Sequence, residues 1–547
     1  MITPYWLNTF WMASCATEAR AFRRATRCVR QTQLQLLLGL LRDNQSTWYG
    51  REYGFGQIAT STEFQQRVPM TNGDQAREPI QRIADGETNV LTFEQVMLLE
   101  PTGGSTNAEK LIPYTNTLRK QFQRGLAVWI YDVMNCLPAA RRGRAYWSIS
   151  PIAETARRSA GGIPIGFEDD REYLGAWQRW AVSKLLVVPP HVRHLRSSTN
   201  ARYVTLLHLL SSRDLSLVSI WSPTYLNALL KNLSDWLEPI CADLRAGRTR
   251  LPQPEQEPVD CELPLRRCVD RADELFRIFG GSQSMPDKLA ECWPQLALIS
   301  CWADAASEMY VPPLKSLFPG VLLQPKGLLA TEGIVSFPLM SMTGSVLAIR
   351  SHFFEFVDTA SGKIQLADEL ELNCRYRVVI TTGGGLYRYD LGDEVEVVGY
   401  HHDCPRIRFL GRSNAISDLV GEKLNERHVR DSIRRACQEL GIKPEFVLLA
   451  PTRNLPANYR LFLECGDQPG GSMFPRNLAR RLEEQLRTNP HYRIAISSGQ
   501  LSEVDVRLLE SPGWERYQKV CVGRGQKIGD IKPAVLDMWN GWDGIFS

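Results

Sequence analysis

A cluster of small and hydroxylated residues follows the apolar run that ends at Leu99. The cluster consists of Thr102, Gly103, Gly104, Ser105 and Thr106. Lys110 comes four residues later. Glycines let the backbone approach a ligand and expose successive N–H groups, hydroxyls add donors, and lysine supplies positive charge. The pattern predicts either a turn that cradles phosphate groups or an ordinary flexible loop; it is not a Walker loop, because GxxxxGKS/T is absent.

A second stretch with several motifs runs from residue 383 to residue 429. Its motifs are Tyr-Arg-Tyr-Asp-Leu-Gly-Asp ending at Asp393, Gly-Arg-Ser-Asn from Gly411 and Gly-Glu-Lys-Leu from Gly421. With the turn at 102–106, and in this order, they resemble the motifs of adenylate-forming enzymes, the superfamily of acyl-CoA synthetases, adenylation domains and luciferases. More narrowly, the chain resembles the auxin-responsive promoter family of acyl acid-amido synthetases in its bacterial form. Further matching segments are 47–55, 79–91, 221–226, 293–304, 318–339 and 353–357.

The resemblance implies an α/β protein with a large N-terminal adenylate-forming domain, built of layered sheets and helices, and a small mobile C-terminal α/β lid. We place the adenylation and acyl-acid-binding domain at residues 1–410, the hinge at 411–418 and the lid at 419–547. The residue pattern favours the same class, because helical segments alternate with short apolar strands.

The resemblance also implies roles for individual residues in ATP binding. Residues 102–106 and Lys110 would hold the β- and γ-phosphates, and Glu332 would assist Mg²⁺ and ATP. Mg²⁺ prefers oxygen ligands and keeps several waters, so one carboxylate together with the phosphates is enough. Thr331 would add a hydroxyl toward the phosphate or the acyl carboxylate.

Three positions depart from the family pattern. Gly103 stands where a serine is typical, and Asn107 stands where a glycine is typical. Leu328 stands where plant members often have an aromatic residue that stacks on adenine. The first two changes remove a hydroxyl and some backbone freedom from the turn, and the third leaves recognition of the base to other apolar atoms.

The nucleoside and the reacting phosphate have candidates of their own. The resemblance implies that Asp393 accepts both ribose hydroxyls and that Arg412, at the hinge, contacts ribose or phosphate through its fixed donor fork. The stretch 523–536 resembles the terminal segment that presents a lysine to the acyl carboxylate and the α-phosphate. Lys532 and Lys527 both fit this role by charge, and Lys532 is slightly favoured.

Composition limits the class of protein. The chain has 547 residues, of which 44% are hydrophobic and 23% charged, with a net charge of +4. Single cores stop growing near roughly 250 to 300 residues, so we expect more than one domain.

The small net charge gives no reason to expect a nucleic acid or a membrane surface as partner, and no apolar run is long enough to span a bilayer. Thirteen cysteines without CxxC pairs argue against a disulfide framework or a zinc site and favour the reducing cytoplasm.

Hydrophobic periodicity predicts the elements around these motifs. We expect helices at 16–42, 117–135, 173–186, 201–210, 426–440 and 475–488, and strands at 145–150, 217–221, 375–381, 394–400, 445–450, 459–464 and 491–497. The aromatic residues Trp221, Tyr225, Trp302 and Phe337 could line an acid pocket or simply belong to the core.

The main hypothesis is an ATP- and Mg²⁺-dependent acyl acid-amido synthetase. It would adenylate a carboxylic acid, release pyrophosphate, and transfer the acyl group to the amine of an amino acid or another amine, giving an amide and AMP. Rotation of the lid about the hinge would expose the acyl-adenylate to the amine. Two alternatives stay open: an acyl-CoA ligase with coenzyme A as acceptor, and a catalytically weakened small-molecule binding protein.

Overall fold

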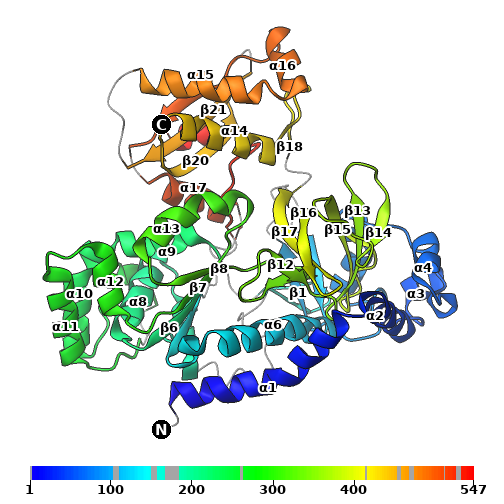
Figure 1. The fold of residues 1–547 in the computed structure, drawn as a ribbon, viewed down its shortest axis with the longest axis horizontal. Helices are drawn as coiled ribbons and strands as arrows, with labels where there is room; N and C mark the ends of the chain where they lie inside the picture. Colours follow the sequence, from blue (N-terminus) through cyan, green and yellow to red (C-terminus); the bar gives the residue numbers. More distant parts are fainter. Residues whose placement is uncertain are drawn as a thin grey trace. The chain divides into compact units, whose positions relative to one another are not determined.

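The computed structural model describes the chain except for residues 1–2, 103–109, 149–156, 167–183, 259–262, 413–415, 453–456, 467–472, 511, 525, 527–530 and 547. The chain divides into two compact units (Figure 1). Unit 1 comprises Met1–Ala303, Pro313–Leu391 and Val395–Phe409, and unit 2 comprises Asp304–Pro312, Gly392–Glu394 and Leu410–Ser547. The division into 1–410, 411–418 and 419–547 stays a prediction. Most of the predicted helix at 173–186 lies outside the described residues.

Two helices open unit 1 where the sequence predicted a single one at 16–42. They are α1 (Pro4–Ala25) and α2 (Val29–Asp43). The prediction was wrong at the break, where the Thr26 hydroxyl donates to the Arg23 carbonyl at 2.8 Å. The Thr26 carbonyl in turn accepts the N–H of Asp403 at 2.9 Å. A contact with a residue so distant in the chain explains why local periodicity did not reveal the break.

A seven-stranded sheet forms one half of unit 1 and carries the second group of motifs. Its strands are β11 (Ser336–Pro338), β12 (Ser345–Leu347), β13 (Phe353–Asp358), β14 (Ile364–Leu366), β15 (Arg375–Thr381), β16 (Tyr389–His401) and β17 (Cys404–Arg412). Their order is β11-β12-β17-β16-β15-β13-β14. Strand β13 pairs antiparallel with both β14 and β15, and its phenylalanines are buried, as aromatic residues in a central strand usually are.

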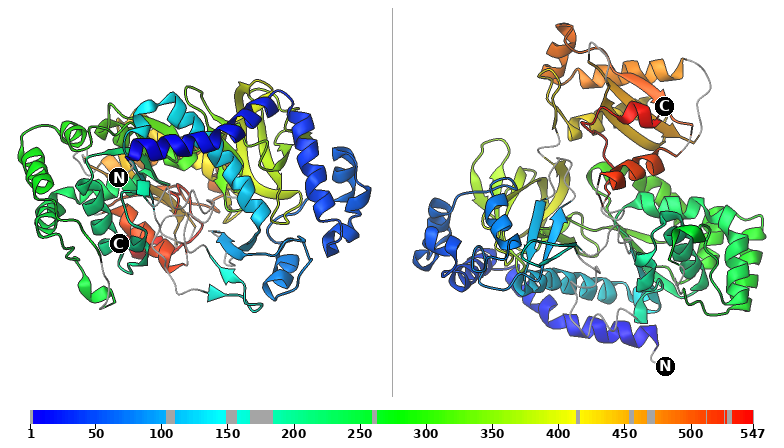
Figure 2. Two further views of the ribbon diagram at one scale, coloured as in Figure 1. Left: turned by 90° about the horizontal axis from the view of Figure 1, so that it is seen from below. Right: turned by 180° about the vertical axis from the view of Figure 1, so that it is seen from behind.

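A four-stranded parallel sheet forms the other half, with the order β3-β6-β7-β8. Its strands are β3 (Arg144–Trp147), β6 (Leu215–Ser219), β7 (Leu298–Cys301) and β8 (Leu322–Pro325). Every residue of β6 and β7 is buried, as expected where helices cover a parallel sheet. The helices between the strands are α8 (Ser198–Ser211), α9 (Pro223–Lys231), α10 (Leu233–Ala246), α11 (Val269–Gly280) and α12 (Met285–Cys292), drawn in green in Figure 2.

Two antiparallel hairpins of unit 1 carry the predicted ATP-binding residues. The first joins β1 (Leu98–Thr102) to β2 (Lys110–Tyr114), and the second joins β9 (Leu329–Ala330) to β10 (Gly333–Ile334). Helix α6 (Asn116–Cys136) follows β2 and is capped by Thr115, whose hydroxyl accepts the Leu118 N–H at 3.1 Å. Further α-helices and strands of unit 1 are α3 (Trp48–Glu52), α4 (Ser61–Arg67), α5 (Arg77–Ala84), β4 (Arg157–Arg158), β5 (Pro164–Ile165) and most of α13 (Val311–Leu317).

Unit 2 is built around a three-stranded sheet with its own hydrophobic core. Its elements are β18 (Ile416–Ser417), β19 (Leu424–Asn425), α14 (Glu426–Glu439), β20 (Pro444–Pro451), β21 (Tyr459–Cys465), α15 (Phe474–Leu486), α16 (Pro490–Ser497), β22 (Asp505–Leu508), α17 (Gly513–Gly523) and α18 (Trp542–Phe546). The predicted strand at 491–497 is wrong, because Asn489 caps a helix there by accepting the N–H of His491 at 2.9 Å. The third strand is β22, which pairs parallel with β21.

Candidate active site

The ends of the predicted phosphate turn lie next to each other. Thr102, the last residue of β1, is directly opposite Lys110, the first residue of β2. The turn itself, with Gly103, Gly104, Ser105 and Thr106, lies outside the described residues. The Lys110 ammonium lies 3.3 Å from a carboxylate oxygen of Asp74. Lys110 therefore lies beside the turn. Its partner Asp74 is exposed, and an exposed ion pair is weak, so Asp74 competes only weakly with a bound anion for the Lys110 ammonium.

The turn between β9 and β10 presents Thr331 and Glu332 and is fixed to the first hairpin. The hydroxyl of Tyr114, at the end of β2, donates a hydrogen bond to the Thr331 carbonyl at 2.9 Å. Tyr114 is buried, so this bond is shielded from water. It holds the residue next to Glu332 against the strand that leaves the predicted phosphate turn.

A buried histidine fixes the other side of the same hairpin. Nε2 of His352 accepts the N–H of Ile334 at 3.2 Å. Burial lowers the pKa of His352 to about 3, so the ring is neutral at pH 7 and Nε2 can act as acceptor. The ring also packs edge-on against Phe122, which stacks on Tyr114. Neither Tyr114 nor His352 was a sequence candidate, because their partners are backbone groups far away in the chain.

Asp393 and Arg412, both of unit 2, form an ion pair. Asp393 is 4% exposed, and its carboxylate lies 3.4 Å from Nε of Arg412. Gly392 precedes it with a φ of 70°, a conformation that glycine adopts without strain. The structure therefore brings together the two residues that the sequence predicted to contact the nucleoside.

Glu426 is a third charged residue of unit 2 that the sequence did not reveal as important. Burial raises its pKa, and the positive charges of Arg430, Arg412 and Lys532 oppose that shift. Its carboxylate also accepts the N–H of Val535 at 3.3 Å.

Of the two candidate lysines near the C-terminus, the structure describes Lys532. Lys532 is exposed and its carbonyl accepts the Tyr517 hydroxyl at 3.4 Å. Lys527 lies outside the described residues.

Aromatic residues and a lysine gather where the parallel strands of unit 1 end. The Trp221 and Trp302 rings lie 5.3 Å apart, and the ammonium of Lys326 lies 5.0 Å from the centre of the Trp221 ring. Lys326 also donates to the Ser219 hydroxyl at 2.6 Å. Ligands of open α/β sheets bind at the carboxyl ends of the strands, where these residues lie.

Tyr225 and Phe337 complete the set of predicted pocket residues. The Tyr225 hydroxyl lies 3.4 Å from that of Tyr146, whose ring is buried. Phe337 is buried against Phe22 of α1, with ring centres 5.1 Å apart. Phe337 therefore belongs to the core between α1 and the large sheet.

The donors present fit Mg²⁺ bound by a single protein carboxylate. Among the described residues, no three His, Cys, Asp or Glu side chains cluster as a metal cage would require. Glu332 is partly exposed in its turn. A hard cation that keeps its waters and phosphate ligands needs no more than this from the protein.

Comparisons with known proteins show the family of the chain. Three family models match: the GH3 family N-terminal domain over residues 18–323, the GH3 family central domain over 345–412 and the GH3 family C-terminal domain over 427–537. The chain belongs to the GH3 family. The family resemblance read from the motifs is thus confirmed.

The matches extend over nearly the whole GH3 chain. Indole-3-acetic acid-amido synthetase GH3.3 of Arabidopsis thaliana is 22% identical, with 94% of this chain and 90% of that protein covered. GH3.17 of the same plant, also named an indole-3-acetic acid-amido synthetase, is 24% identical over 91% of this chain and 90% of its own. Both proteins carry names for amide-forming synthetases.

Solved structures confirm the predicted fold class. AtGH3.15 acyl acid amido synthetase in complex with 2,4-DB superimposes with a TM-score of 0.84 at 17% identity, covering 98% of this chain and 95% of that chain. A 2-hydroxyisobutyryl-CoA ligase gives 0.50 at 11% identity, covering 96% and 90%. The mixed α/β adenylate-forming fold is therefore shared beyond the GH3 family.

One departure from the family pattern has a structural explanation. Leu328 is 5% exposed and packs in the main core of unit 1. Its N–H donates to the Ser336 hydroxyl at 3.0 Å. Its side chain fills the core, so it does not replace an aromatic ring on adenine. No helix in the described part of the chain is long and apolar enough to cross a membrane.

Proposed function

We propose that this GH3 chain is an ATP-dependent acyl acid-amido synthetase. It joins a carboxylic acid to the amine of an amino acid and releases pyrophosphate and AMP. The observation that carries the proposal is the hydrogen bond from Tyr114 to Thr331, because it ties the hairpin with the predicted phosphate turn to the hairpin that presents Glu332. Adenylation needs phosphate donors and a cation-binding carboxylate held in a fixed relation.

The chemistry proceeds in two displacements. A carboxylate oxygen of the acid attacks the α-phosphorus of ATP, and pyrophosphate leaves. The amine nitrogen then attacks the carbonyl carbon of the acyl-adenylate, AMP leaves, and the nitrogen loses a proton. Adenylation converts a poor leaving group into a good one, so no covalent enzyme nucleophile is needed.

Each site residue has a role in the proposal. Residues 102–106 and Lys110 bind the β- and γ-phosphates, and Thr331 adds a hydroxyl beside them. Mg²⁺ held by Glu332 and the phosphates would neutralise charge on the leaving pyrophosphate. In unit 2, Asp393 and Arg412 bind the ribose.

The reacting α-phosphate receives its positive charge from a C-terminal lysine in this proposal. We assign that lysine to Lys532, with Lys527 as the alternative. The exposed Lys532 side chain and the anchoring of its backbone by Tyr517 support the choice. A fixed backbone with an exposed side chain suits a group that must reach a developing charge.

We place the acid beside Trp221, Trp302 and Lys326. The two indoles offer flat apolar surfaces, and Lys326 offers a cation to an acid that is negatively charged at pH 7. The names of the plant relatives, which specify indole-3-acetic acid, support a flat aromatic acid. A panel of acids of different sizes tests this placement directly.

The cytoplasm is the proposed location. All twelve described cysteines are free, and burial raises the pKa of several of them, Cys292 to about 12 among them. Free cysteines are usual where thiols stay reduced. ATP is available in the same compartment, and neither a nucleic acid nor a membrane is needed for the reaction.

The test measures pyrophosphate release with ATP, Mg²⁺ and a panel of aromatic and aliphatic acids, with and without amino acids. Glu332→Gln and Asp393→Asn should each lower release by about tenfold to a hundredfold, since hydrogen bonds to charged groups contribute about 1.5 to 3 kcal/mol. Glu396→Gln is the matched control, because Glu396 lies on the same strand as Asp393 and pairs with the exposed Arg408.

Two outcomes would overturn the proposal. A thioester mass formed with coenzyme A, without any amide from amino acids, would make the protein an acyl-CoA ligase. ATP binding without pyrophosphate release for any acid would make it a binding protein. An amide mass that appears only with acid, ATP and amino acid together would establish the synthetase.

A further inference from the structure

The outward face of α1 carries an ordered stripe of residues. Its members are Trp6, Phe10, Ala13, Thr17, Arg20 and Arg24. Their spacing alternates between four and three residues, which keeps all six within about 80° of arc on the helix. Trp6 is 54% exposed and Phe10 is 56% exposed. The opposite side of α1 packs against α6 and the core, at the edge of unit 1 that is blue in Figure 1.

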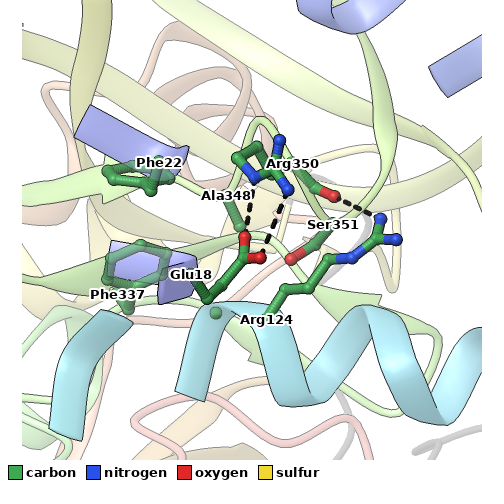
Figure 3. A pocket seen from close by; sticks show the side chains of 8 residues that line it. Glu18, Phe22, Arg124, Phe337, Ala348, Arg350 and Ser351 are labelled. Atoms are coloured by element: carbon green, nitrogen blue, oxygen red, sulfur yellow. Dashed lines mark hydrogen bonds and ion pairs between the residues drawn. The ribbon is translucent and has the colours of Figure 1, made fainter. Parts of the chain in front are cut away.

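This face differs from an ordinary solvated one, which would mix acidic and basic residues. The only acidic residue of α1 is Glu18, and it points inward, where both its oxygens accept hydrogen bonds from Arg350 at 2.7 and 3.2 Å (Figure 3). The hydroxyls of Thr9 and Ser14, which flank the stripe, donate to carbonyls of their own helix. Arg20 and Arg24 form no ion pair with any described residue.

The stripe is complementary to itself when two copies run antiparallel. A two-fold axis near Cys15 places Trp6 opposite Arg24 of the other copy, Phe10 opposite Arg20, and Ala13 opposite Thr17. Arginine on an aromatic face is a favourable cation–π pair, and small residues at the centre allow two helices to approach closely. Each pair occurs twice in a symmetric dimer.

We propose that the chain forms a two-fold dimer through antiparallel packing of this α1 stripe. The contact extends over about 27 Å of helix, from Trp6 to Arg24. One helix pair buries less than a standard stable interface, so we expect a weak dimer that forms at micromolar concentration.

A second copy fits the stripe better than a lipid surface does. A helix that lies on a membrane has its basic residues along the borders of one continuous apolar face. Here the aromatic residues occupy one end of the stripe and the arginines the other. A flat membrane would offer suitable partners to only one end of the stripe at a time. An antiparallel copy places arginines on the aromatic end and aromatic rings on the basic end.

Sedimentation velocity of the full chain over a range of concentrations tests the proposal. Trp6→Ala and Arg24→Ala should each weaken the dimer about five- to thirtyfold, because each removes two cation–π pairs. The double variant should be little weaker than either single one. The two residues lie about 27 Å apart in one chain and cannot contact each other there. If the effects of the two substitutions on dimer affinity are not additive, the two residues must therefore contact each other across the dimer interface.

The matched control is Phe276→Ala. Phe276 lies on α11, is 56% exposed like Phe10 and is not part of the stripe, so its removal should leave the dimer unchanged. A monomer at all concentrations, or a dimer that none of the α1 variants weakens, would overturn the proposal. Flotation with anionic vesicles that is lost in Trp6→Ala would assign the stripe to lipid and overturn it as well.

Cross-linking tests the direction of the helices. In a background where the exposed Cys28 and Cys136 are replaced by serine, Ala13→Cys chains are mixed with Thr17→Cys chains. The antiparallel pair predicts fast disulfide formation in the mixture and slow formation in either variant alone. Faster linkage within each single variant would indicate a parallel pair and contradict the proposed register.

Discussion

His352 is the residue whose protonation state decides how the β9–β10 hairpin is held. Its Nε2 accepts a backbone N–H only while the ring is neutral. Within the described structure, Nδ1 is buried without a hydrogen-bond partner. A protonated ring would therefore lose its acceptor and place a charge in the core.

We expect this histidine to make the protein acid-sensitive. Its pKa in the folded chain, about 3, is below the ordinary value of 6.5, so between these values the unfolded chain binds more protons. The contribution of the neutral ring to the free energy of unfolding is fully present above pH 6.5 and is lost as the pH falls. At pH 5 the free energy of unfolding is lower by about 2 kcal/mol because of this residue.

His352→Gln isolates this contribution, because glutamine keeps an acceptor in a similar place but does not titrate. Urea unfolding at pH 7 and pH 5 should show the variant losing about 2 kcal/mol less than the parent on acidification. His208, whose pKa burial lowers to about 4, contributes equally to both proteins and cancels. An identical pH dependence in parent and variant would contradict the assignment.

Tyr114 provides a second prediction at the scale of one hydroxyl. Tyr114→Phe removes the donor to Thr331 while keeping the stacked ring. A hydrogen bond contributes about 0.5 to 1.5 kcal/mol, so pyrophosphate release should fall about two- to tenfold. Tyr203→Phe is the control: it removes another buried hydroxyl, which donates to Asp243 at 2.9 Å between α8 and α10. Equal losses in the two variants would mean that Tyr114 serves stability alone.

At this scale the sequence predicted residues that lie in motifs and missed those that hold the motifs in place. Asp393 and Arg412 were predicted together and lie together. Tyr114 and His352 were missed because the bonds they make are to backbone groups 217 and 18 residues away. Neither bond leaves a pattern of residue types, so only the folded chain reveals it.

The β9–β10 hairpin is the element on which the proposed chemistry depends most. Gly333 opens β10, and a Cβ there would lie 2.7 Å from Nε2 of His352 and 2.8 Å from the side chain of Ile380. Both neighbours are buried. Gly333→Ala therefore forces the hairpin to move, and a shift of about 1 Å at a catalytic group can lower the rate about a hundredfold. Steady-state pyrophosphate release measures the loss.

Gly39→Ala is the matched control for that variant. Gly39 lies within α2, and a Cβ there meets nothing within 4 Å. Alanine should stabilise the helix by about 0.5 to 1 kcal/mol and leave activity unchanged. If Gly333→Ala retained full activity, the close packing around the hairpin would not control its position.

The sequence predicted helices and strands correctly where the local residue pattern determines them. It did not predict features that depend on a contact with a distant part of the chain. The helix at 426–440 and the strands at 445–450 and 459–464 are confirmed within a residue or so. Arg388, in the Tyr-Arg-Tyr motif, is a different case. It is buried with a φ of 48° and donates to Glu355 and to the carbonyl of Val68. Its motif suggested nothing of this structural role, because Glu355 lies on β13, 33 residues away in the chain.

At the scale of the whole molecule, unit 2 draws on three separate parts of the chain. Its core includes Ala306, and Met309 packs against the same core. Tyr310 is 4% exposed, and burial raises its pKa well above the ordinary value. The segment Asp304–Pro312 is therefore an integral part of unit 2, although no sequence pattern indicates that it belongs with residues about a hundred positions later.

A fragment of residues 410–547 should consequently be less stable than unit 2 in the intact chain. It lacks the buried Tyr310 side chain, and burial of one large side chain contributes about 1.5 to 3 kcal/mol. Adding a peptide of residues 302–314 in excess should raise the melting temperature of the fragment, because a ligand that binds only the folded state stabilises it. The same peptide with Tyr310→Ala should raise it much less. If neither peptide changes the melting temperature of the fragment, unit 2 folds completely without this segment.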